Sequence, residues 1–294
     1  MTYFWWVINQ VRSMGIFGHR HLANAKGSVK MENLLSPNTI LHFQMKKLSV
    51  EAGDSVVPAD VRYENESFKI RVAHNGQRRA TAQLLVQKLY GRRGYQPTDE
   101  ASADAQQSEL DRITLMVNNR EGLTVGTVTI APDGPQGLMA DTLYRPELDQ
   151  LRGDPAVRLL EYSKLAIDRH FGNSQKVVAM LFNMAYIYVK LLGCNRIVIE
   201  VNPRHVSFYQ SSLGFKVIGE ERLCPRVNAP AVLLMLEVAH VAEQVHRFEG
   251  IHAAGRPAEG SDRKNLYRYS LSEEEEKELT ARIVASADTL ATRV

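Results

Sequence analysis

The chain has 294 residues, of which 44% are hydrophobic and 23% charged, a composition typical of a globular protein with a substantial core. Its formal net charge of +3 does not indicate nucleic-acid binding, which is typically marked by a dense basic surface. The two cysteines, Cys194 and Cys224, lie in apolar segments without metal-ligand spacing. We therefore expect a cytosolic protein with reduced thiols and neither a disulfide nor a metal site.

The first ten residues, MTYFWWVINQ, are rich in aromatic side chains, but this run is much shorter than the ~20 apolar residues that span a bilayer. We interpret it as a mobile leader, with contact at a membrane surface as the alternative. The residues that follow have mixed charge and no sustained hydrophobic period. Residues 1–66 are therefore predicted to be a poorly ordered N-terminal extension.

The predicted folded domain, residues 67–240, begins with a strand, a helix and a hairpin. FKIRVA alternates like a strand, and QRRATAQLLVQKLY predicts a helix that ends near Gly91. The predicted buried face of this helix consists of Ala80, Leu84, Val86 and Leu89. DRITLMV and TVGTVTI lie on either side of NNREG and predict a β-hairpin, whereas residues 132–156 are expected to be irregular.

The second half of this domain reads as strand, helix and strand. VRLLEYSKLAI and RIVIEV are the strands, and SQKVVAMLFNMAYIYVKLLG is a long apolar helix between them. This order predicts a parallel pair with a right-handed crossover. A short helix after Pro203, a strand KVIGE and a final strand AVLLMLEV complete an α/β (α+β) fold, a mixed sheet with helices on both faces.

Residues 241–294 are predicted to be a C-terminal helical tail. A helix, AHVAEQVHRFEGIHAAG, is followed by a linker rich in Gly, Pro and Ser at 254–262. The last helix is predicted to begin at Ser272, with Glu275 three residues on as a capping box.

Three segments carry a family resemblance. The order of elements and the closing segment NPRHVSFYQSSLGF resemble the GNAT acyltransferase superfamily. LLEYSKLAID, PRHVSFYQSSLGF and RVNAPAVLL are together similar to long-chain N-acyl amino acid synthases of the FeeM type, which are relatives of the acyl-homoserine lactone synthases. The resemblance implies transfer of a fatty acyl group from a thioester to the amino group of a free amino acid. It also implies that the two parallel strands splay apart to admit the thioester.

The resemblance further implies a donor site. GNAT enzymes that use coenzyme A carry a Q/R-x-x-G-x-G/A loop, whose backbone amides hold the pyrophosphate. The corresponding segment here is RHFGNS. Arg169 and Gly172 match the pattern, and Ser174 occupies the position of its last Gly or Ala. Because the loop departs from the pattern, the predicted donor is acyl carrier protein with its phosphopantetheine arm, and no tightly bound cofactor is expected. Asn202 is assigned to the same donor site.

The resemblance also supplies candidate catalytic residues. Tyr209 occupies the position from which a GNAT tyrosine protonates the departing thiolate, and a ring that only packs is the alternative. His205 is a second candidate proton carrier, or else a surface residue. Glu161 resembles the strand glutamate of the lactone synthases, which would accept the amine proton or bind the ammonium. Pairing with Lys164, or exposure at an edge, is the alternative for Glu161.

Binding residues are predicted from chemistry. An arginine suits the carboxylate of the amino acid, and the candidates are Arg71, Arg92, Arg93 and Arg226. Arg226 and its neighbour Asn228 are favoured because they precede the last strand and match the family segment RVNAPA. Met180, Phe182 and Met184 on the long helix are candidate lining for the acyl chain, with simple core packing as the alternative. The basic residues between Arg78 and Arg93 would steer an acidic carrier protein, or form a solvated helix face.

Three other functions stay open. An acyl-CoA-dependent N-acetyltransferase is disfavoured by the altered loop, and a homoserine lactone synthase by the absence of tryptophan from residues 91–110. A non-catalytic module that binds acyl-ACP and regulates is the alternative from a different class.

Overall fold

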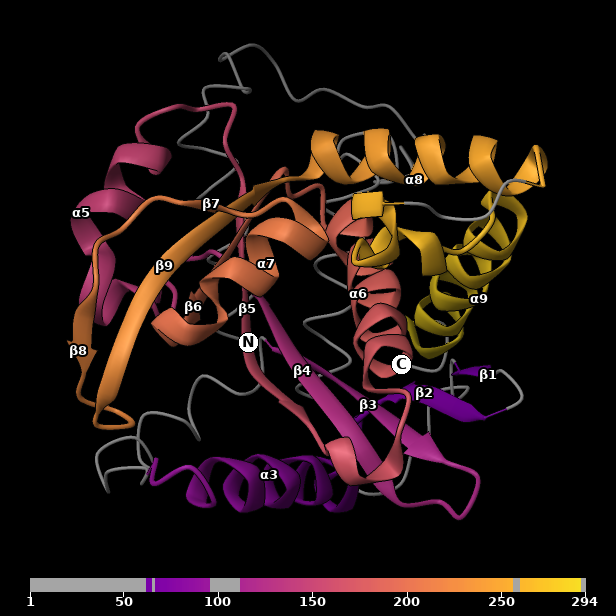
Figure 1. Ribbon diagram of the computed structural model, residues 1–294, viewed down its shortest axis with the longest axis horizontal. Helices are drawn as coiled ribbons and strands as arrows, with labels where there is room; N and C mark the ends of the chain where they lie inside the picture. The colour runs from indigo at the N-terminus through magenta and orange to yellow at the C-terminus, as the bar shows by residue number, and fades with distance from the viewer. Residues whose placement is uncertain (1–61, 65–66, 96–111, 256–259, 292–294) are drawn as a thin grey trace, which may run out of the picture. The chain divides into compact units, whose positions relative to one another are not determined.

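The computed structural model describes residues 62–64, 67–95, 112–255 and 260–291 (Figure 1). All described residues belong to one compact unit. The aromatic leader and nearly all of the predicted extension lie outside the described residues. The exception is residues 62–64, which form a strand.

The described residues form nine strands and six α-helices. The strands are β1 (Arg62–Glu64), β2 (Phe68–Val72), β3 (Ile113–Asn119), β4 (Thr124–Pro132), β5 (Leu159–Ile167), β6 (Arg196–Val201), β7 (Lys216–Val217), β8 (Arg222–Cys224) and β9 (Ala229–Glu237). The helices are α3 (Gly76–Gly91), α5 (Asp141–Arg152), α6 (Ser174–Leu191), α7 (Val206–Leu213), α8 (Val238–Ala253) and α9 (Glu273–Ala291). Short 3-10 turns are η3 (Arg169–Phe171), η4 (Pro203–His205), η5 (Gly260–Arg263) and η6 (Leu266–Tyr269).

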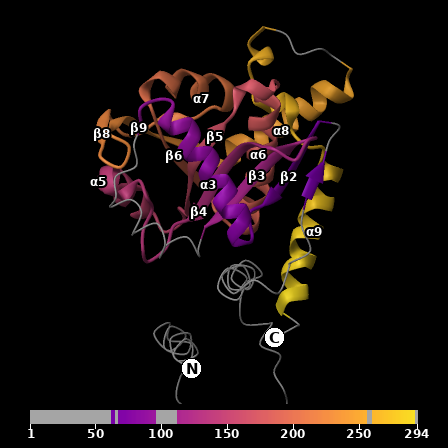
Figure 2. The same ribbon diagram turned by 90° about the horizontal axis from the view of Figure 1, so that it is seen from below.

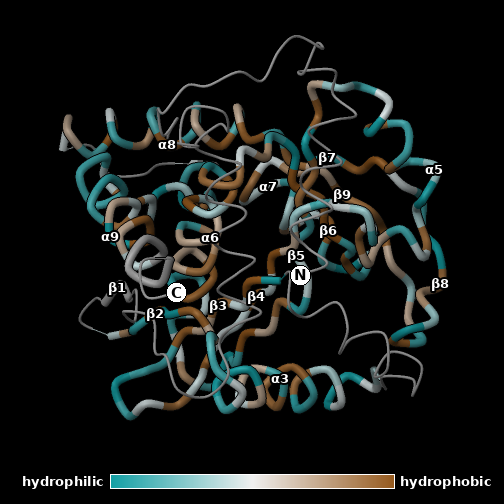
Figure 3. Tube along the Cα trace, turned by 180° about the vertical axis from the view of Figure 1, so that it is seen from behind, coloured by the Kyte–Doolittle hydropathy of each residue, from teal (hydrophilic) through white to brown (hydrophobic). Residues whose placement is uncertain are grey.

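The sheet has the order β1-β2-β3-β4-β5-β6-β9-β7, and β8 pairs with β9. Each described pair is antiparallel except β5 with β6, which is parallel. The predicted hairpin is β3 and β4, and the predicted strand, helix and strand are β5, α6 and β6. The predicted α/β fold with a mixed sheet is therefore confirmed. Figure 3 shows hydrophobic residues concentrated along β4, β5 and β6.

One face of the sheet packs on α6. Leu160 and Tyr162 of β5 and Ile199 of β6 are buried there with most of the α6 side chains. The tail belongs to the same core, since Phe248 of α8 and Leu279 of α9 are buried in it. Figure 1 shows α8 and α9 beside α6. Residues 238–291 thus complete the core of the acyltransferase domain.

The opposite face is covered by α3 and α5. Both α3 and α6 contact β3, β4 and β5, and they lie on opposite sides of these strands (Figures 1 and 2). Alongside α3, Tyr144 and Leu148 of α5 form a second core with Leu159, Val198 and Leu233. Alternate residues of β5, β6 and β9 therefore belong to different cores.

The helix α5 contradicts the prediction that residues 132–156 are irregular. Its local signal is weak because it contains Pro146 and a non-helical Tyr144. Tertiary contacts compensate, since the Tyr144 hydroxyl donates to the carbonyl of Ala231 at 2.6 Å. Helix formation here depends on packing more than on propensity.

Three smaller features can be compared with the prediction: the buried face of α3, the strands β7 and β8, and the capping box before α9. The buried residues of α3 are Ala82 and Leu85, while Leu84 is 64% exposed, so the predicted face was wrong. The strand predicted from KVIGE is reduced to Lys216–Val217, and β8 was not foreseen. The capping box is confirmed, because the Glu275 carboxylate accepts from the Ser272 amide at 2.9 Å and the Ser272 hydroxyl accepts from the Glu275 amide at 3.3 Å.

Candidate active site

The parallel strands β5 and β6 separate partway along their length. They pair from Leu159 opposite Arg196 to Tyr162 opposite Ile199. Beyond this point β5 continues to Ile167 along β4, and β6 continues to Val201 along β9. We call the position where Tyr162 and Ile199 end the pairing the fork. The splay implied by the resemblance is confirmed.

A β-bulge lies on β5 just beyond the fork. Thr129 faces Ser163 and Thr127 faces Ala166, so two residues of β5 oppose one of β4. Lys164, inside the bulge, has a φ of 50°, in the left-handed region that non-glycine residues rarely occupy. Amides released from the ladder at such a bulge can polarise a carbonyl. Lysine has no special preference for this conformation, so no residue type in the sequence marks the bulge.

Glu161 precedes the fork by one residue and is 1% exposed. One carboxylate oxygen accepts a hydrogen bond from the Met139 amide at 2.7 Å. Burial, and then the negative charge of Glu200, raise the pKa of Glu161 to about 7. The hydrogen bond from the Met139 amide and the positive charges of Arg112 and Arg226 lower this pKa and partly offset the rise. The carboxyl group can thus exchange a proton near neutral pH. Edge exposure, one alternative for Glu161, is excluded.

Glu200 is a residue that the sequence reasoning missed. It follows Ile199 on β6, beyond the fork, and alternation places it on the face that carries Glu161. Its carboxylate forms an ion pair with Arg226, whose other nitrogen donates to the Met139 carbonyl at 2.8 Å. Burial raises the pKa of Glu200, and Arg226 opposes the rise. The available signal was a lone acid inside the apolar strand RIVIEV, which parallels Glu161 in LLEYSKLAI.

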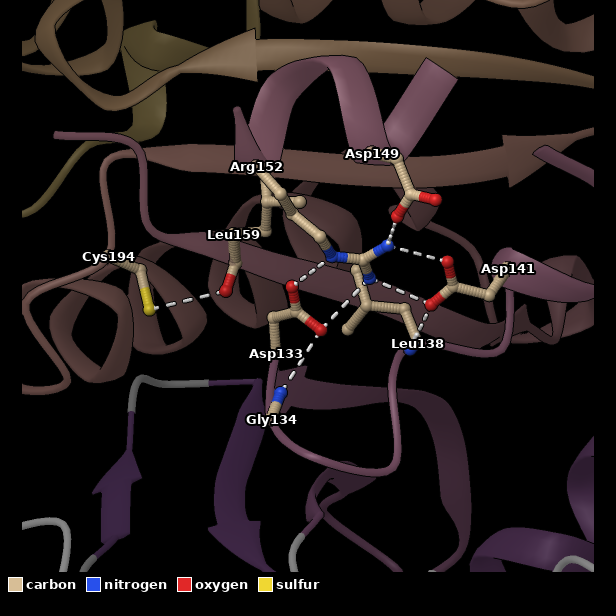
Figure 4. A network of polar contacts seen from close by, with 8 residues as sticks. All are labelled: Asp133, Gly134, Leu138, Asp141, Asp149, Arg152, Leu159 and Cys194. Carbon is tan, nitrogen blue, oxygen red and sulfur yellow. Dashed lines mark hydrogen bonds and ion pairs between the residues drawn. The ribbon is translucent and has the colours of Figure 1, made fainter. Parts of the chain in front are cut away.

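The segment that contains Met139 is joined by a clamp around Arg152, whose hydrogen bonds are drawn in Figure 4. The Arg152 guanidinium forms two hydrogen bonds with Asp133, at 2.7 and 3.0 Å, and two with Asp141, at 2.7 and 2.8 Å. Asp141 also accepts from the Leu138 amide at 2.6 Å. The clamp joins both ends of the segment 133–141, so the Met139 amide and carbonyl are presented to Glu161 and Arg226 in fixed positions.

Tyr209 lies on α7 and is 7% exposed. The rings of Phe208 and Phe215 meet it edge-on, at centroid distances of 5.3 and 5.6 Å. Burial raises its pKa, with a further rise from Tyr90 and an opposing effect of Arg93. Within the described residues its hydroxyl has no hydrogen bond, so it retains a donor for a ligand.

His205 ends η4, directly before α7. Burial, together with the positive charges of Arg93, Arg204 and Arg169, lowers its pKa, so its imidazole is neutral at pH 7 and can accept a proton. The Arg204 guanidinium of η4 donates to the Tyr95 hydroxyl, so the residues that follow α3 lie close to the start of α7. Both candidate proton carriers are therefore in one region.

The predicted donor loop joins β5 to α6. Arg169 and Gly172 are exposed, and Ser174 is the first residue of α6. Gly172 has a φ of 66° with a ψ of 178°, a conformation open essentially to glycine alone. Asn202 has a structural task, because its side chain accepts from the Arg204 amide and donates to the Pro230 carbonyl at 3.3 and 3.2 Å.

The predicted lining residues Met180, Phe182 and Met184 are all buried in the α6 core. Phe182 meets the Tyr162 ring edge-on at 5.3 Å, which brings it beside the fork. Asn228 is exposed in the turn between β8 and β9, with a φ of 47°. Asparagine tolerates this conformation better than most residues, which accounts for its presence in the turn.

A mixed sheet whose parallel pair parts at a bulge, with helices on both faces, is the GNAT fold of acyltransferases. A family model described as N-acyl amino acid synthase FeeM matches residues 81–237, more than half of the chain. The chain belongs to this family and is an acyltransferase.

Three solved structures are similar to this chain, and the first of them agrees with the family assignment. The structure of FeeM, an N-acyl amino acid synthase from uncultured soil microbes, is 29% identical and has a TM-score of 0.53, covering 59% of this chain and 92% of that chain. The AHL synthase LasI is 17% identical with a TM-score of 0.41, covering 58% and 89%. A GNAT-family acetyltransferase from Streptococcus pneumoniae is 17% identical with a TM-score of 0.39, covering 58% and 99%.

The search of curated proteins found no match to this sequence. In the described part of the chain, no helix has the length and apolar character to cross a membrane.

Proposed function

We propose that this enzyme transfers a long-chain fatty acyl group from the thioester of acyl carrier protein to the amino group of a free amino acid. The observation that carries the proposal is the fork, where a bulge on β5 adjoins the buried carboxyl group of Glu161. Family membership supports the same reaction class. Aminolysis of a thioester needs a polarised carbonyl and a base for the amine, and this position offers both.

In the proposed reaction the amine nitrogen attacks the thioester carbonyl carbon, so a C–N bond forms and the C–S bond breaks. Glu161 accepts a proton from the amino group, because its raised pKa suits proton exchange near neutrality. Backbone amides of the bulge at Lys164 donate hydrogen bonds that stabilise the negative charge developing on the carbonyl oxygen. Tyr209 donates its hydroxyl proton to the departing thiolate. His205, whose neutral imidazole can accept a proton, is the second candidate proton carrier.

Acyl carrier protein is the proposed donor because the exposed loop RHFGNS has Ser174 where the pyrophosphate-binding pattern has Gly or Ala. Arg169, Gly172 and Ser174 would then contact the phosphopantetheine arm, with Asn202 fixing the neighbouring corner. Exposed Arg92, Arg93 and Arg204 add positive charge that favours an acidic carrier.

The acyl chain is proposed to extend from the fork toward Phe182, with Met180 and Met184 beside it. Since the Arg226 guanidinium already binds Glu200, we propose Asn228 as the more available contact for the amino acid's carboxylate. Both cysteines are free and buried, and on that ground we place the reaction in the cytosol.

The test is to incubate the purified protein with acyl-ACP, acyl-CoA and a mixture of amino acids, and to identify the products by mass spectrometry. An N-acyl amino acid formed from acyl-ACP supports the proposal. Product only from short acyl-CoA would overturn it in favour of an N-acetyltransferase, and an acyl lactone would indicate a lactone synthase. Binding of ACP without any product would indicate a regulatory module.

A further inference from the structure

Two buried polar groups lie just beyond the fork, one on each of the parted strands. Tyr162 and Ile199 are the last paired residues of β5 and β6, so Ser163 and Glu200 are the first residue of each strand beyond the pairing. The Ser163 hydroxyl and one carboxylate oxygen of Glu200, Oε1, are both buried, and neither has a hydrogen-bond partner among the described residues. Such groups are costly to bury unless something binds them.

The electrostatic surroundings indicate what this ligand group must be. The other oxygen of Glu200, Oε2, is bound by Arg226, which favours the ionised carboxylate. Glu161 lies near enough for the charge of Glu200 to affect its proton affinity. An anion would be repelled by two carboxyl groups, whereas a primary ammonium offers three N–H donors and a positive charge.

We propose that Glu200 binds the amino group of the acceptor through Oε1 and holds it at the fork, where Glu161 takes its proton. This inference rests on the proposed function. Glu200 is the holder because Arg226 keeps it charged, while Glu161, which the Met139 amide contacts, is the carboxyl group that changes protonation. The ammonium passes one proton to Glu161, and the neutral amine then attacks the thioester carbonyl carbon. The second proton that the nitrogen loses as the amide forms replaces the one that Tyr209 gives to the departing thiolate. Ser163 provides a further hydrogen-bond partner for the same amino group.

The experiment compares Glu200→Gln with the wild type in steady-state kinetics, varying amino acid and acyl donor separately. Loss of a hydrogen bond between charged groups corresponds to about a ten- to hundred-fold change. We expect KM for the amino acid to rise by this factor and KM for the donor to stay unchanged. Calorimetric titration of the amino acid without donor should show the same weakening. Glu147→Gln is the matched control, because Glu147 lies on α5, outside the fork, and the substitution breaks its ion pair with Arg222 of β8.

The outcomes separate this inference from the function on which it rests. Wild-type protein that makes no N-acyl amino acid overturns the proposed function. Active wild type with an unchanged amino acid KM in Glu200→Gln overturns only the role of Glu200. If Glu200→Gln does not fold, Glu200→Asp serves instead, because it keeps the charge beside Arg226 and withdraws the carboxylate from the fork. An unchanged KM in folded Glu200→Asp also overturns the inference.

Discussion

Replacement of Glu161 by Gln should remove a specific pH dependence from the stability of the fold. The group lies between β4 and β6, with Glu200, Arg226 and Arg112 as the charged groups that affect it. Its pKa is raised from 4.5 to about 7, which corresponds to about 3 kcal/mol at ~1.4 kcal/mol per pKa unit. Gln has the shape of the protonated acid and can still accept the hydrogen bond from the Met139 amide.

The sign follows from proton binding. Between pH 4.5 and about 7 the folded protein holds a proton on Glu161 that the unfolded chain has released, so unfolding free energy falls as pH rises through this window. The stabilising contribution is fully present below pH 4.5 and is lost above about pH 7. Relative to the wild type, Glu161→Gln should therefore gain stability with rising pH, by about 3 kcal/mol across the window.

Urea unfolding of both proteins at several pH values from about 4 to about 8 measures this difference directly. Glu147→Gln provides the opposite sign, because the hydrogen bond from Arg222 lowers the pKa of Glu147. Its stability relative to the wild type should fall as pH rises through the acidic range. A difference between Glu161→Gln and wild type that is independent of pH would refute the reasoning about Glu161.

Three further predictions concern other parts of the molecule. Tyr209→Phe should lower turnover about a hundred-fold while the melting temperature changes little, since the ring keeps its contacts with Phe208; unchanged turnover would exclude the hydroxyl from proton transfer. Arg152→Lys should lower the free energy of unfolding in urea by about 1–3 kcal/mol. It should also move the acid limb of the pH profile of kcat/KM to higher pH, because a less firmly held Met139 amide stabilises the Glu161 carboxylate less. An acid limb at the same pH as in the wild type would contradict the positioning role of Arg152. Phe248→Ala should cost about 3–5 kcal/mol, since its ring is fully buried, and a loss below 1 kcal/mol would contradict its place in the core.

The sequence predicted the central elements because their patterns are local. The hairpin of β3 and β4 follows from two alternating runs around a turn, and β5, α6 and β6 follow from apolar runs of the right lengths. The capping box at Ser272 was also predictable, since both partners lie within one turn. The splay between β5 and β6 was then implied by the family resemblance, which rests on the order of these elements and on the family motifs.

The details of the site depend on contacts that are distant in sequence. Arg226 was predicted to bind the carboxylate of the amino acid, but its ion pair with Glu200, 26 positions away, was not predicted. Met139, which contacts Glu161, lies in a segment expected to be irregular, and it is held there by Arg152. No periodicity marks such a clamp, because three aspartates and an arginine look like ordinary surface charge in the sequence. Glu200 was passed over because one acid in a strand does not reveal which face is buried.

The tail shows how a domain boundary drawn from sequence can divide one core. The family model ends at residue 237, and composition suggested a separate tail from 241 onward. In the structure the Tyr267 hydroxyl donates to the Leu213 carbonyl at 2.9 Å, and Asn183 donates to the Tyr269 carbonyl at 2.7 Å. These bonds tie η6 to both α7 and α6. Since α7 carries Tyr209 and α6 carries Phe182, the tail stabilises the two helices that flank the fork on that face, and its packing should affect catalysis as well as stability.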